Sequence, residues 1–417
     1  MTASQAAARK TIAICTAIYA LDGLIHTILG PLAPEIARTL SLGNAELGPI
    51  FSSNLIGQCI GLVLFPAIAA RIGHRLTVSL AVIGFGLGQC ASALADSGPS
   101  LFAIRLATGV FLGGCLPSCL AIVAEEAQPA RRGVSILTLF TGYGLGAALA
   151  GAVAAGFAEL GGWRVAMVAV GVLSLATAGG AWIWLREPRP SEPVAQAERA
   201  ASSSSAPLQL LGGRYLVGTL MLWLLFVLML TISYCLNSWL PIMLVEAGFT
   251  ESFAALSVTT FGFGGAIAAL GVGLLIDRLG AMPVLLAFLA AAAGLLFATG
   301  QVMDNASTGL LTVLLAAAGF FSLGAYGGVN VVLAAFYPGP LRATGIGWAK
   351  SVGRLGTVIA PIAIGLALAA GMAGSTVMSL FAVPAVLAAL VLVVISFTAS
   401  WAEQHPRNGR AAQQTGA

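Results

Sequence analysis

The feature that most constrains this chain is a series of long apolar segments, separated by short stretches rich in proline, glycine and charge. Twelve segments are long enough to span a bilayer, because a membrane-crossing helix needs about 20 apolar residues. Charged residues make up only 8% of the chain, against about 25% in a soluble domain. The sequence therefore predicts an all-α membrane protein. The expected spans cover residues 11–33, 48–70, 76–95, 100–123, 134–157, 164–185, 215–237, 253–275, 282–301, 309–332, 346–369 and 376–399.

Basic residues are distributed unevenly between the two sides of the expected membrane. Of the 19 Lys and Arg residues, fourteen lie in loops on the side of the termini, and only Arg38 and Arg164 lie in the opposite loops. Cytoplasmic loops carry an excess of these residues, so we expect both termini in the cytoplasm and the protein in the cell (inner) membrane. Their scattering predicts no nucleic-acid partner. The fourteen are Arg9, Lys10, Arg71, Arg75, Arg131, Arg132, Arg186, Arg189, Arg199, Arg214, Arg278, Arg342, Arg407 and Arg410.

Residues 186–214 interrupt the apolar pattern with several prolines and a run of serines. We interpret this stretch as a flexible cytoplasmic linker between two six-helix halves, residues 1–185 and 215–400. Residues 401–417 then form a cytoplasmic tail.

The two halves also resemble each other in sequence. Residues 67–73, after the second expected span, correspond to residues 274–280, after the eighth. Gly142-Tyr143 in the fifth span corresponds to Gly353-Arg354 in the eleventh. Duplicated six-helix units are typical of transporters whose substrate sites lie near the bilayer midplane, between the repeats.

Asp22 is a carboxylate deep inside the first expected span. An ionised side chain there costs roughly 2.5 to 3.5 kcal/mol on insertion scales, so it requires a partner, a cavity or a proton. Tyr19, Asp22 and His26 follow at i, i+3 and i+7, which places them on one helical face. We expect Asp22 to bind a proton with help from His26, whose imidazole titrates near neutral pH. The alternative is a buried hydrogen bond between helices.

The eleventh span carries Lys350, Arg354 and Thr357 on one face. Lys350 is close enough to the boundary for its amine to reach water, whereas Arg354 lies about 12 Å inside by helical rise. A guanidinium binds a carboxylate through two parallel hydrogen bonds, so Arg354 suits an organic acid. The alternative is a structural ion pair between the two halves.

Two further charged sites lie on the fourth span. Arg105 lies about a turn below the outer end. One interpretation is an anchor whose side chain extends outward to the membrane surface. Glu125 lies at the inner end and could pair with Arg71 or Arg75, which would hold one conformation closed. The alternative for Glu125 is a solvated charge cluster that contributes under about 1 kcal/mol.

Polar residues recur at i+4 on other spans and predict a water-filled cavity. They are Asn54 and Gln58, Ser233 and Asn237, and Ser322, Tyr326 and Asn330. Around such a cavity, Arg105, Lys350 and Arg354 contribute +3 and an ionised Asp22 contributes −1, which leaves a net +2 that attracts an anion. Protonation of Asp22 makes the cavity more positive, so a proton and an anion would bind cooperatively.

The chain resembles the major facilitator superfamily over nearly its whole length. Residues 273–280, with Asp277 and Arg278, match the motif that follows the second span of each half in that superfamily. The first-half copy keeps Arg71 and Arg75 but has Ala70 in place of the acid. The resemblance implies a twelve-helix fold of two six-helix repeats, with a gating role for Arg71, Arg75, Glu125, Asp277 and Arg278. It also associates an arginine like Arg105 with proton coupling.

A narrower resemblance is to the aromatic acid:proton symporter family. It is carried by residues 237–241, by residues 337–361 of the eleventh span, and by Asp22-Gly23. It implies import of a small aromatic carboxylate with a proton. The proton-coupling residues would be Asp22, His26 and Arg105. The substrate-binding residues would be Arg354, Tyr19, Asn237, Tyr326, Trp348 and Lys350.

One departure from the family concerns proton coupling. The family has an Asp-Gly-aromatic-Asp pattern, whereas this chain has Asp22-Gly23-Leu24-Ile25. Loss of the second acid bears on proton stoichiometry. The alternatives are a proton-driven exporter of hydrophobic drugs and a non-transporting membrane sensor. No nucleophile–base or metal-ligand pattern indicates an enzyme, a metal or another cofactor. The expected partners are an organic anion, a proton and the lipid bilayer, with the protein acting as a monomer.

Overall fold

The computed structural model describes residues 3–128, 132–158, 160–187, 210–212 and 215–398. Within these ranges the regular structure is helical, and twelve spans are long and apolar enough to cross a membrane. The helices are α1 (Ala3–Thr27), α2 (Leu29–Leu40), α3 (Asn44–Ile72), α4 (His74–Ser92), α5 (Gly98–Glu126), α6 (Arg132–Ala158), α7 (Gly162–Trp184), α10 (Leu216–Glu246), α11 (Glu251–Leu279), α12 (Ala281–Val302), α13 (Thr308–Phe336), α14 (Gly339–Ala369), α15 (Gly374–Leu380) and α16 (Ala382–Ser396).

The predicted twelve-span fold is confirmed, but two predicted spans are too short. The first span was expected to end at residue 33 and continues to Leu40, as α1 and α2 joined at Ile28. The seventh was expected to end at residue 237, yet α10 continues through Pro241 to Glu246. Proline is tolerated within membrane helices because neighbouring groups satisfy the freed backbone, so it did not end either span. Most of the predicted linker and the whole predicted tail lie outside the described residues.

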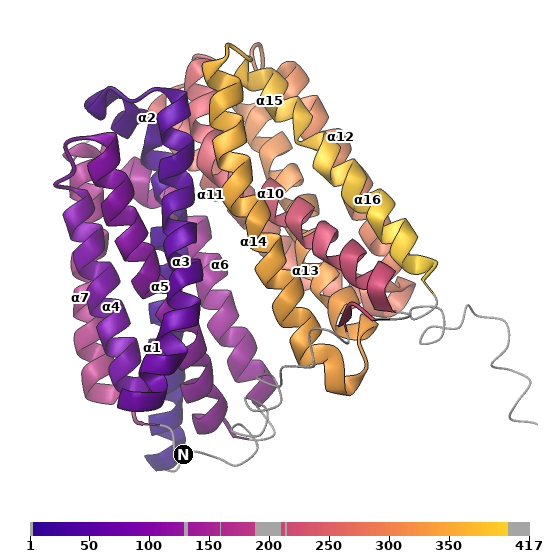
Figure 1. Cartoon of the computed structure of the whole chain (residues 1–417). Coiled ribbons are helices and arrows are strands. Elements are labelled where there is room, and N and C mark those ends of the chain that lie inside the picture. The colour runs from indigo at the N-terminus through magenta and orange to yellow at the C-terminus, as the bar shows by residue number, and fades with distance from the viewer. Residues whose placement is uncertain (1–2, 129–131, 159, 188–209, 213–214, 399–417) are drawn as a thin grey trace, which may run out of the picture.

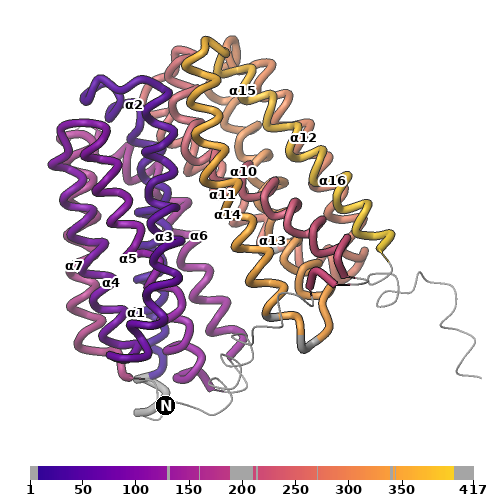
Figure 2. The backbone as a smooth tube through the Cα atoms, in the orientation of Figure 1, coloured from indigo at the N-terminus to yellow at the C-terminus, as the bar shows by residue number. Residues whose placement is uncertain are grey.

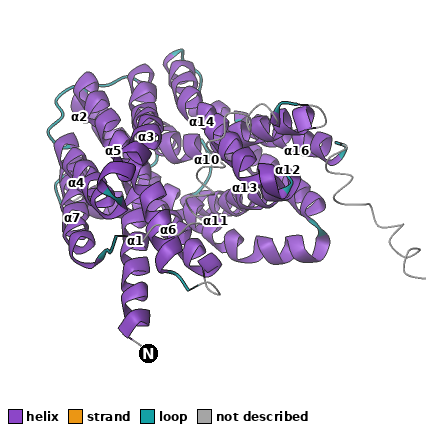
Figure 3. Ribbon diagram, turned by 60° about the horizontal axis from the view of Figure 1, so that its bottom comes forward, coloured by secondary structure: helices purple, strands orange, loops and turns teal. Residues whose placement is uncertain are grey.

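The helices form two bundles, α1–α7 and α10–α16, which stand side by side (Figures 1 and 2). They converge near α2 and α15 and diverge toward the end that carries the N-terminus of α1, here called the terminal side. Turned by 60°, Figure 3 shows α3, α6, α10, α11 and α14 nearest the boundary between the bundles.

Hydrogen bonds between the two halves lie away from the terminal side. Ser52 Oγ on α3 donates to the carbonyl of Val358 on α14 at 2.7 Å. The Ala152 N–H on α6 donates to Thr259 Oγ1 on α11 at 2.8 Å. The amide of Asn44, at the start of α3, donates to Glu246 at 2.9 Å. These contacts fasten the two halves together at the end opposite the terminal side.

Glycine allows α1 and α6 to approach closely around the site described below. A Cβ on Gly146 of α6 would collide with the backbone carbonyl of Ala20, and a Cβ on Gly23 of α1 would collide with that of Tyr143. Small residues permit such backbone contact between membrane helices. The contact holds Asp22, which neighbours Gly23, beside the α6 segment that carries Tyr143.

The internal repeat extends to backbone conformation. Gly73 follows α3 with φ +87° and ψ 161°, and Gly280 follows α11 with φ +86° and ψ 153°. Only glycine adopts this region without strain. Each glycine N–H also bonds to the carbonyl four residues earlier, at 2.9 Å and 2.8 Å. The equivalent loops of the two halves therefore share one turn, although Arg71 and Arg278 are the only other residues that 67–73 and 274–280 have in common.

Two glycines of α6 test the close contact with α1. Gly146→Ala should lower the melting temperature of the purified protein by several degrees, because overpacking costs about 1 to 3 kcal/mol. Gly144→Ala is the matched control, since its added methyl group meets nothing within 4 Å. That variant should be neutral or slightly stabilising, because alanine is the better helix former. Equal melting temperatures for both variants in a thermal unfolding assay would contradict the close contact.

Candidate functional site

Asp22 lies in the buried interior of α1, as the sequence indicated. It is 1% exposed, and its Oδ1 atom has no hydrogen-bond partner among the described residues. Its electrostatic neighbours are Arg354 of the other half and the hydroxyls of Tyr19 and Tyr143. The Oδ1 atom, at least, is not held by the helix–helix hydrogen bond that the alternative expected.

Arg354 of α14 reaches across to the N-terminal half. Its Nη1 donates to Oε1 of Gln58 on α3 at 2.5 Å, and the side chain is half-buried. The described residues place no carboxylate within ion-pair distance of the guanidinium, so its direct partner is a neutral amide. The bond does connect the two halves, but it is not the ion pair that the alternative reading expected.

Four aromatic side chains from both halves gather beside Asp22 and Arg354. The ring centroids of Tyr19 and Tyr143 are 5.2 Å apart, and the hydroxyls of Tyr143 and Tyr234 are 3.3 Å apart. The His26 ring meets Tyr234 edge to face at 4.9 Å. Arg354 interacts electrostatically with all three tyrosines. The arrangement combines one cation, one carboxylate and several rings.

Tyr326 of α13 extends this group. Its ring packs edge to face against Phe226 at 6.2 Å, and it interacts electrostatically with Tyr234 and Arg354. The sequence therefore named Tyr19, Asp22, His26, Tyr326 and Arg354, which the structure brings together. It named Gln58 only as one of the polar residues of a water-filled cavity, and it assigned no site role to Tyr143 or Tyr234.

Arg105 is fully buried and does not extend outward. Its Nη1 donates to Oε1 of Gln89 and its Nη2 to the carbonyl of Ile25, both at 2.8 Å. Ile25 lies in the last turn of α1, where carbonyls lack helical partners. Arg105 thus stabilises the end of α1 next to the junction at Ile28, and its charge acts on His26. Its contribution to the site is therefore indirect.

The structure shows other contacts for the remaining three predicted pocket residues. Trp348 is 42% exposed and stacks on Trp223 at 5.8 Å, about 120° around α14 from Arg354. Lys350 is exposed, although its charge acts on Arg354. The amide of Asn237 donates to the Ser233 carbonyl of its own helix at 2.6 Å.

On the terminal side, Arg75 and Glu187 join α4 to the end of α7. Nη2 of Arg75 donates to the Trp182 carbonyl at 2.6 Å, and the guanidinium lies 5.6 Å from the Trp182 ring. The Glu187 carboxylate accepts from the backbone N–H groups of His74 and Arg75 at 2.6 and 3.0 Å. A carboxylate at a helix N-terminus is favourable. Glu187 supplies this carboxylate to α4, and sequence analysis did not identify it.

The other predicted gating residues lie at helix ends. Arg71 is exposed in the last turn of α3, and Glu125 is half-buried in the last turn of α5. Asp277 and Arg278 are exposed in the last turn of α11.

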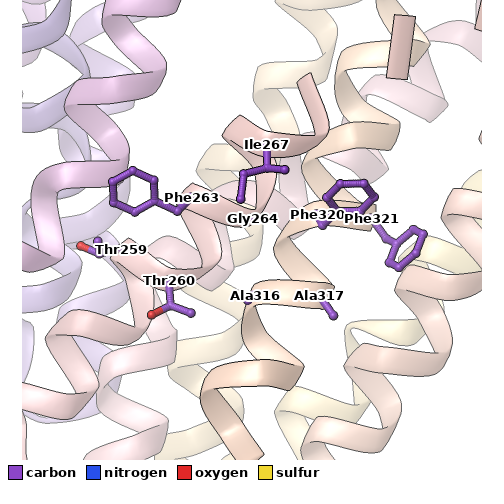
Figure 4. Close-up of a pocket in the computed structure, with 9 residues that line it drawn as sticks. All are labelled: Thr259, Thr260, Phe263, Gly264, Ile267, Ala316, Ala317, Phe320 and Phe321. Carbon is purple, nitrogen blue, oxygen red and sulfur yellow. The ribbon is translucent and has the colours of Figure 1, made fainter. Parts of the chain in front are cut away.

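A separate apolar groove of about 600 Å³ lies between α11 and α13 (Figure 4). On α13 it occupies the face opposite Tyr326, so it is distinct from the Arg354 group. Its lining offers almost no polar surface for a carboxylate. The lining residues are Thr259, Thr260, Phe263, Gly264, Ile267, Ala316, Ala317, Phe320 and Phe321.

Comparison with known proteins supplies independent information. Residues 15–298 and 222–416 match the model of the Major Facilitator Superfamily. A gallate transporter of Pseudomonas putida is 31% identical over 409 residues, which cover 92% of this chain and 90% of the relative. The 4-hydroxybenzoate transporter PcaK of the same organism is 30% identical over 412 residues, 92% of each chain.

A solved structure has the same fold. The crystal structure of a D-xylose–proton symporter superposes with a TM-score of 0.76, at 17% sequence identity, over 92% of this chain and 96% of the other.

Proposed function

Because this chain belongs to the Major Facilitator Superfamily, we propose that it is a secondary transporter that imports a small aromatic carboxylate together with a proton. The observation that carries the proposal is the buried group of Arg354, Asp22 and several tyrosines between the two halves. The relatives named for gallate and 4-hydroxybenzoate support an aromatic acid as the substrate.

Arg354 binds the substrate carboxylate. Gln58 accepts from Nη1, so the edge formed by Nε and Nη2 remains for a two-point contact with a carboxylate. The ring of the substrate then packs against Tyr19, Tyr143, Tyr234 and Tyr326. Aromatic pairs contribute about 0.5 to 1.5 kcal/mol beyond the burial of their area.

Asp22 carries the transported proton. An intramembrane carboxylate with an unpartnered oxygen is costly unless it takes up a proton. Once Asp22 is neutral, its negative charge no longer offsets Arg354, and an anion binds more tightly. The proton gradient across the membrane then drives uptake of the acid. Arg105 assists by holding the end of α1, and His26 assists as a group on which the charges of both Arg105 and Arg354 act.

The proposed carrier sits in the inner membrane as a monomer, with its termini in the cytoplasm. The excess of basic residues on the terminal side supports this orientation. The bundles diverge toward this terminal side (Figure 1), which is then the cytoplasmic side. Closure of that side involves Arg71, Arg75 and Glu125 in one half and Asp277 and Arg278 in the other.

The second candidate is a proton-driven exporter of hydrophobic compounds, and the apolar groove of Figure 4 favours it. A neutral hydrophobic substrate would gain nothing from Arg354, which is costly to hold inside a membrane. The carboxylate carrier therefore accounts for more of the buried charge.

Proton coupling is tested at Asp22. The test measures uptake of a labelled panel of hydroxybenzoates, benzoate, phenylpropanoids, muconate and nicotinate. Cells that make the unaltered protein should accumulate at least one of these acids. Asp22→Asn should abolish accumulation against a gradient, because an amide cannot take up the proton. The membrane level of each variant, measured by immunoblotting, is the control. Normal concentrative uptake by Asp22→Asn would remove Asp22 from the mechanism.

The orientation of Arg354 is tested at Gln58. Gln58→Leu should weaken acid binding about three- to tenfold, because a freed side chain must be ordered when the acid binds. Ser52→Ala is the matched control, since it removes another bond between α3 and α14 without touching Arg354. Calorimetry should give that variant unchanged affinity. Tighter acid binding by Gln58→Leu would mean that Gln58 competes with the substrate instead.

The carboxylate contact is tested at Arg354 itself. Lysine keeps the charge but loses the two-point geometry. Charge-assisted hydrogen bonds contribute about 1.5 to 3 kcal/mol, so Arg354→Lys should weaken binding roughly ten- to a hundredfold. Arg354→Ala should lose more, and an amide analogue of the acid should bind the unaltered protein poorly. Unchanged affinity in both folded variants would exclude Arg354 as the carboxylate ligand.

A further inference from the structure

Three side chains bring their polar atoms together beside Arg354. Tyr143 comes from α6, Tyr234 from α10, and His26 from α1, so both halves contribute. The Tyr143 and Tyr234 hydroxyls lie 3.3 Å apart. The His26 ring lies 4.9 Å from Tyr234 and 6.3 Å from Tyr143, centroid to centroid. Two hydroxyls and one imidazole therefore lie close together.

These groups have hydrogen-bonding capacity that the protein itself does not fill. One of the two tyrosine O–H groups donates to the other, which leaves a second donor and several acceptor lone pairs. Their separation is longer than the usual 2.7 to 2.8 Å of such a bond. Nδ1 of His26 is buried and has no partner among the described residues. Buried polar atoms rarely lack partners, so this region is suited to a polar ligand atom.

The surrounding charges determine which end of an aromatic acid fits here. Asp22 lies near Tyr143, but in the proposed cycle it is protonated when the acid binds, so it carries no charge that attracts or repels the substrate. Arg354 offers the cation that a carboxylate requires. A neutral hydroxyl, in contrast, both donates and accepts hydrogen bonds, which matches a mixed set of phenol and imidazole groups.

We propose that Tyr143, Tyr234 and His26 form a subsite for a hydroxyl group on the substrate ring, so that this carrier selects hydroxylated aromatic acids over unsubstituted ones. The proposal rests on the proposed function, in which Arg354 binds the carboxylate. The ring hydroxyl lies between the two tyrosine hydroxyls. It forms a hydrogen bond with each of them in place of the bond that now joins them. Because one tyrosine belongs to each half, the hydroxylated ring also connects the halves at its far edge.

The experiment compares benzoate with 3- and 4-hydroxybenzoate by calorimetry on the purified full-length protein. The unaltered protein should bind at least one hydroxylated acid about five- to twentyfold more tightly than benzoate. Tyr234→Phe and Tyr143→Phe remove a hydroxyl but keep the ring. Each should bring that ratio close to one, because the variant loses more affinity for the hydroxylated acid than for benzoate. The selective loss is a readout that general destabilisation would not produce.

Tyr337→Phe is the matched control. Its hydroxyl is also buried and donates to Thr219 Oγ1 at 3.1 Å, within the core of the C-terminal half. That variant should keep the preference for the hydroxylated acid. If one site variant fails to fold in a thermal shift assay, the other decides the question. If neither folds, 4-methoxybenzoate binding to the unaltered protein decides it, since the methoxy oxygen cannot donate and should lose the preference.

The outcomes distinguish failure of the hydroxyl subsite from failure of the proposed function on which it rests. Failure of the unaltered protein to bind any of the acids would remove the proposed function. Equal affinity for benzoate and the hydroxybenzoates would overturn the hydroxyl subsite and leave the carboxylate carrier standing. A uniform loss of affinity for all the acids in the two site variants would also overturn the subsite.

Discussion

The central constraint on this protein is the presence of opposite charges within its membrane-spanning helices. Asp22 is 1% exposed and Arg354 is half-buried, yet the two interact electrostatically without forming an ion pair. An intramembrane charge without a partner is costly. The protein meets this cost partly through Gln58, which holds one nitrogen of Arg354. The rest of this cost is offset when Asp22 binds a proton and Arg354 binds an anion. These are the two binding events of the proposed symport.

The close contacts between helices determine where those charges meet. Gly23 and Gly146 bring the backbones of α1 and α6 together, while Gly30 brings the α1–α2 span against the backbone of Asn237 on α10. Arg105 then holds the end of α1 through the Ile25 carbonyl. Asp22 and His26 are therefore placed by packing on three sides, whereas Arg354 arrives from the opposite half. A site divided in this way can change when the two halves move relative to each other.

The fold was predictable because its signals are local. Each span is a run of apolar residues, and the repeat is visible in residues 67–73 and 274–280, which end in Gly73 and Gly280 with almost the same backbone angles. The two span ends that were misplaced contain Pro34 and Pro241, which usually signal a boundary in soluble helices. Inside a membrane bundle that signal is weaker.

The site was predictable only where a residue is costly in a membrane. Asp22 and Arg354 stand out because charge is rare there, and the helical period connects Asp22 to Tyr19 and His26. Gln58, Tyr143 and Tyr234 are ordinary in apolar helices, and their partners lie 296 residues away for Gln58 and 91 residues away for the two tyrosines. Glu187 likewise caps α4 from 113 residues away. No local pattern contains such pairings.

The neutral partner of Arg354 has a consequence for transport. A carboxylate in place of Gln58 would form a buried ion pair, and a substrate could bind only by separating it, at a cost of several kcal/mol. An amide accepts one hydrogen bond and leaves the positive charge uncompensated. The guanidinium is thereby oriented while its charge still attracts an anion. In the proposed symport, release requires the reverse, and deprotonation of Asp22 would provide it, because the restored negative charge competes for Arg354 from its own side of the site. A carrier must bind and release in every cycle, and the pairing of an amide with a titratable acid around one arginine meets both needs.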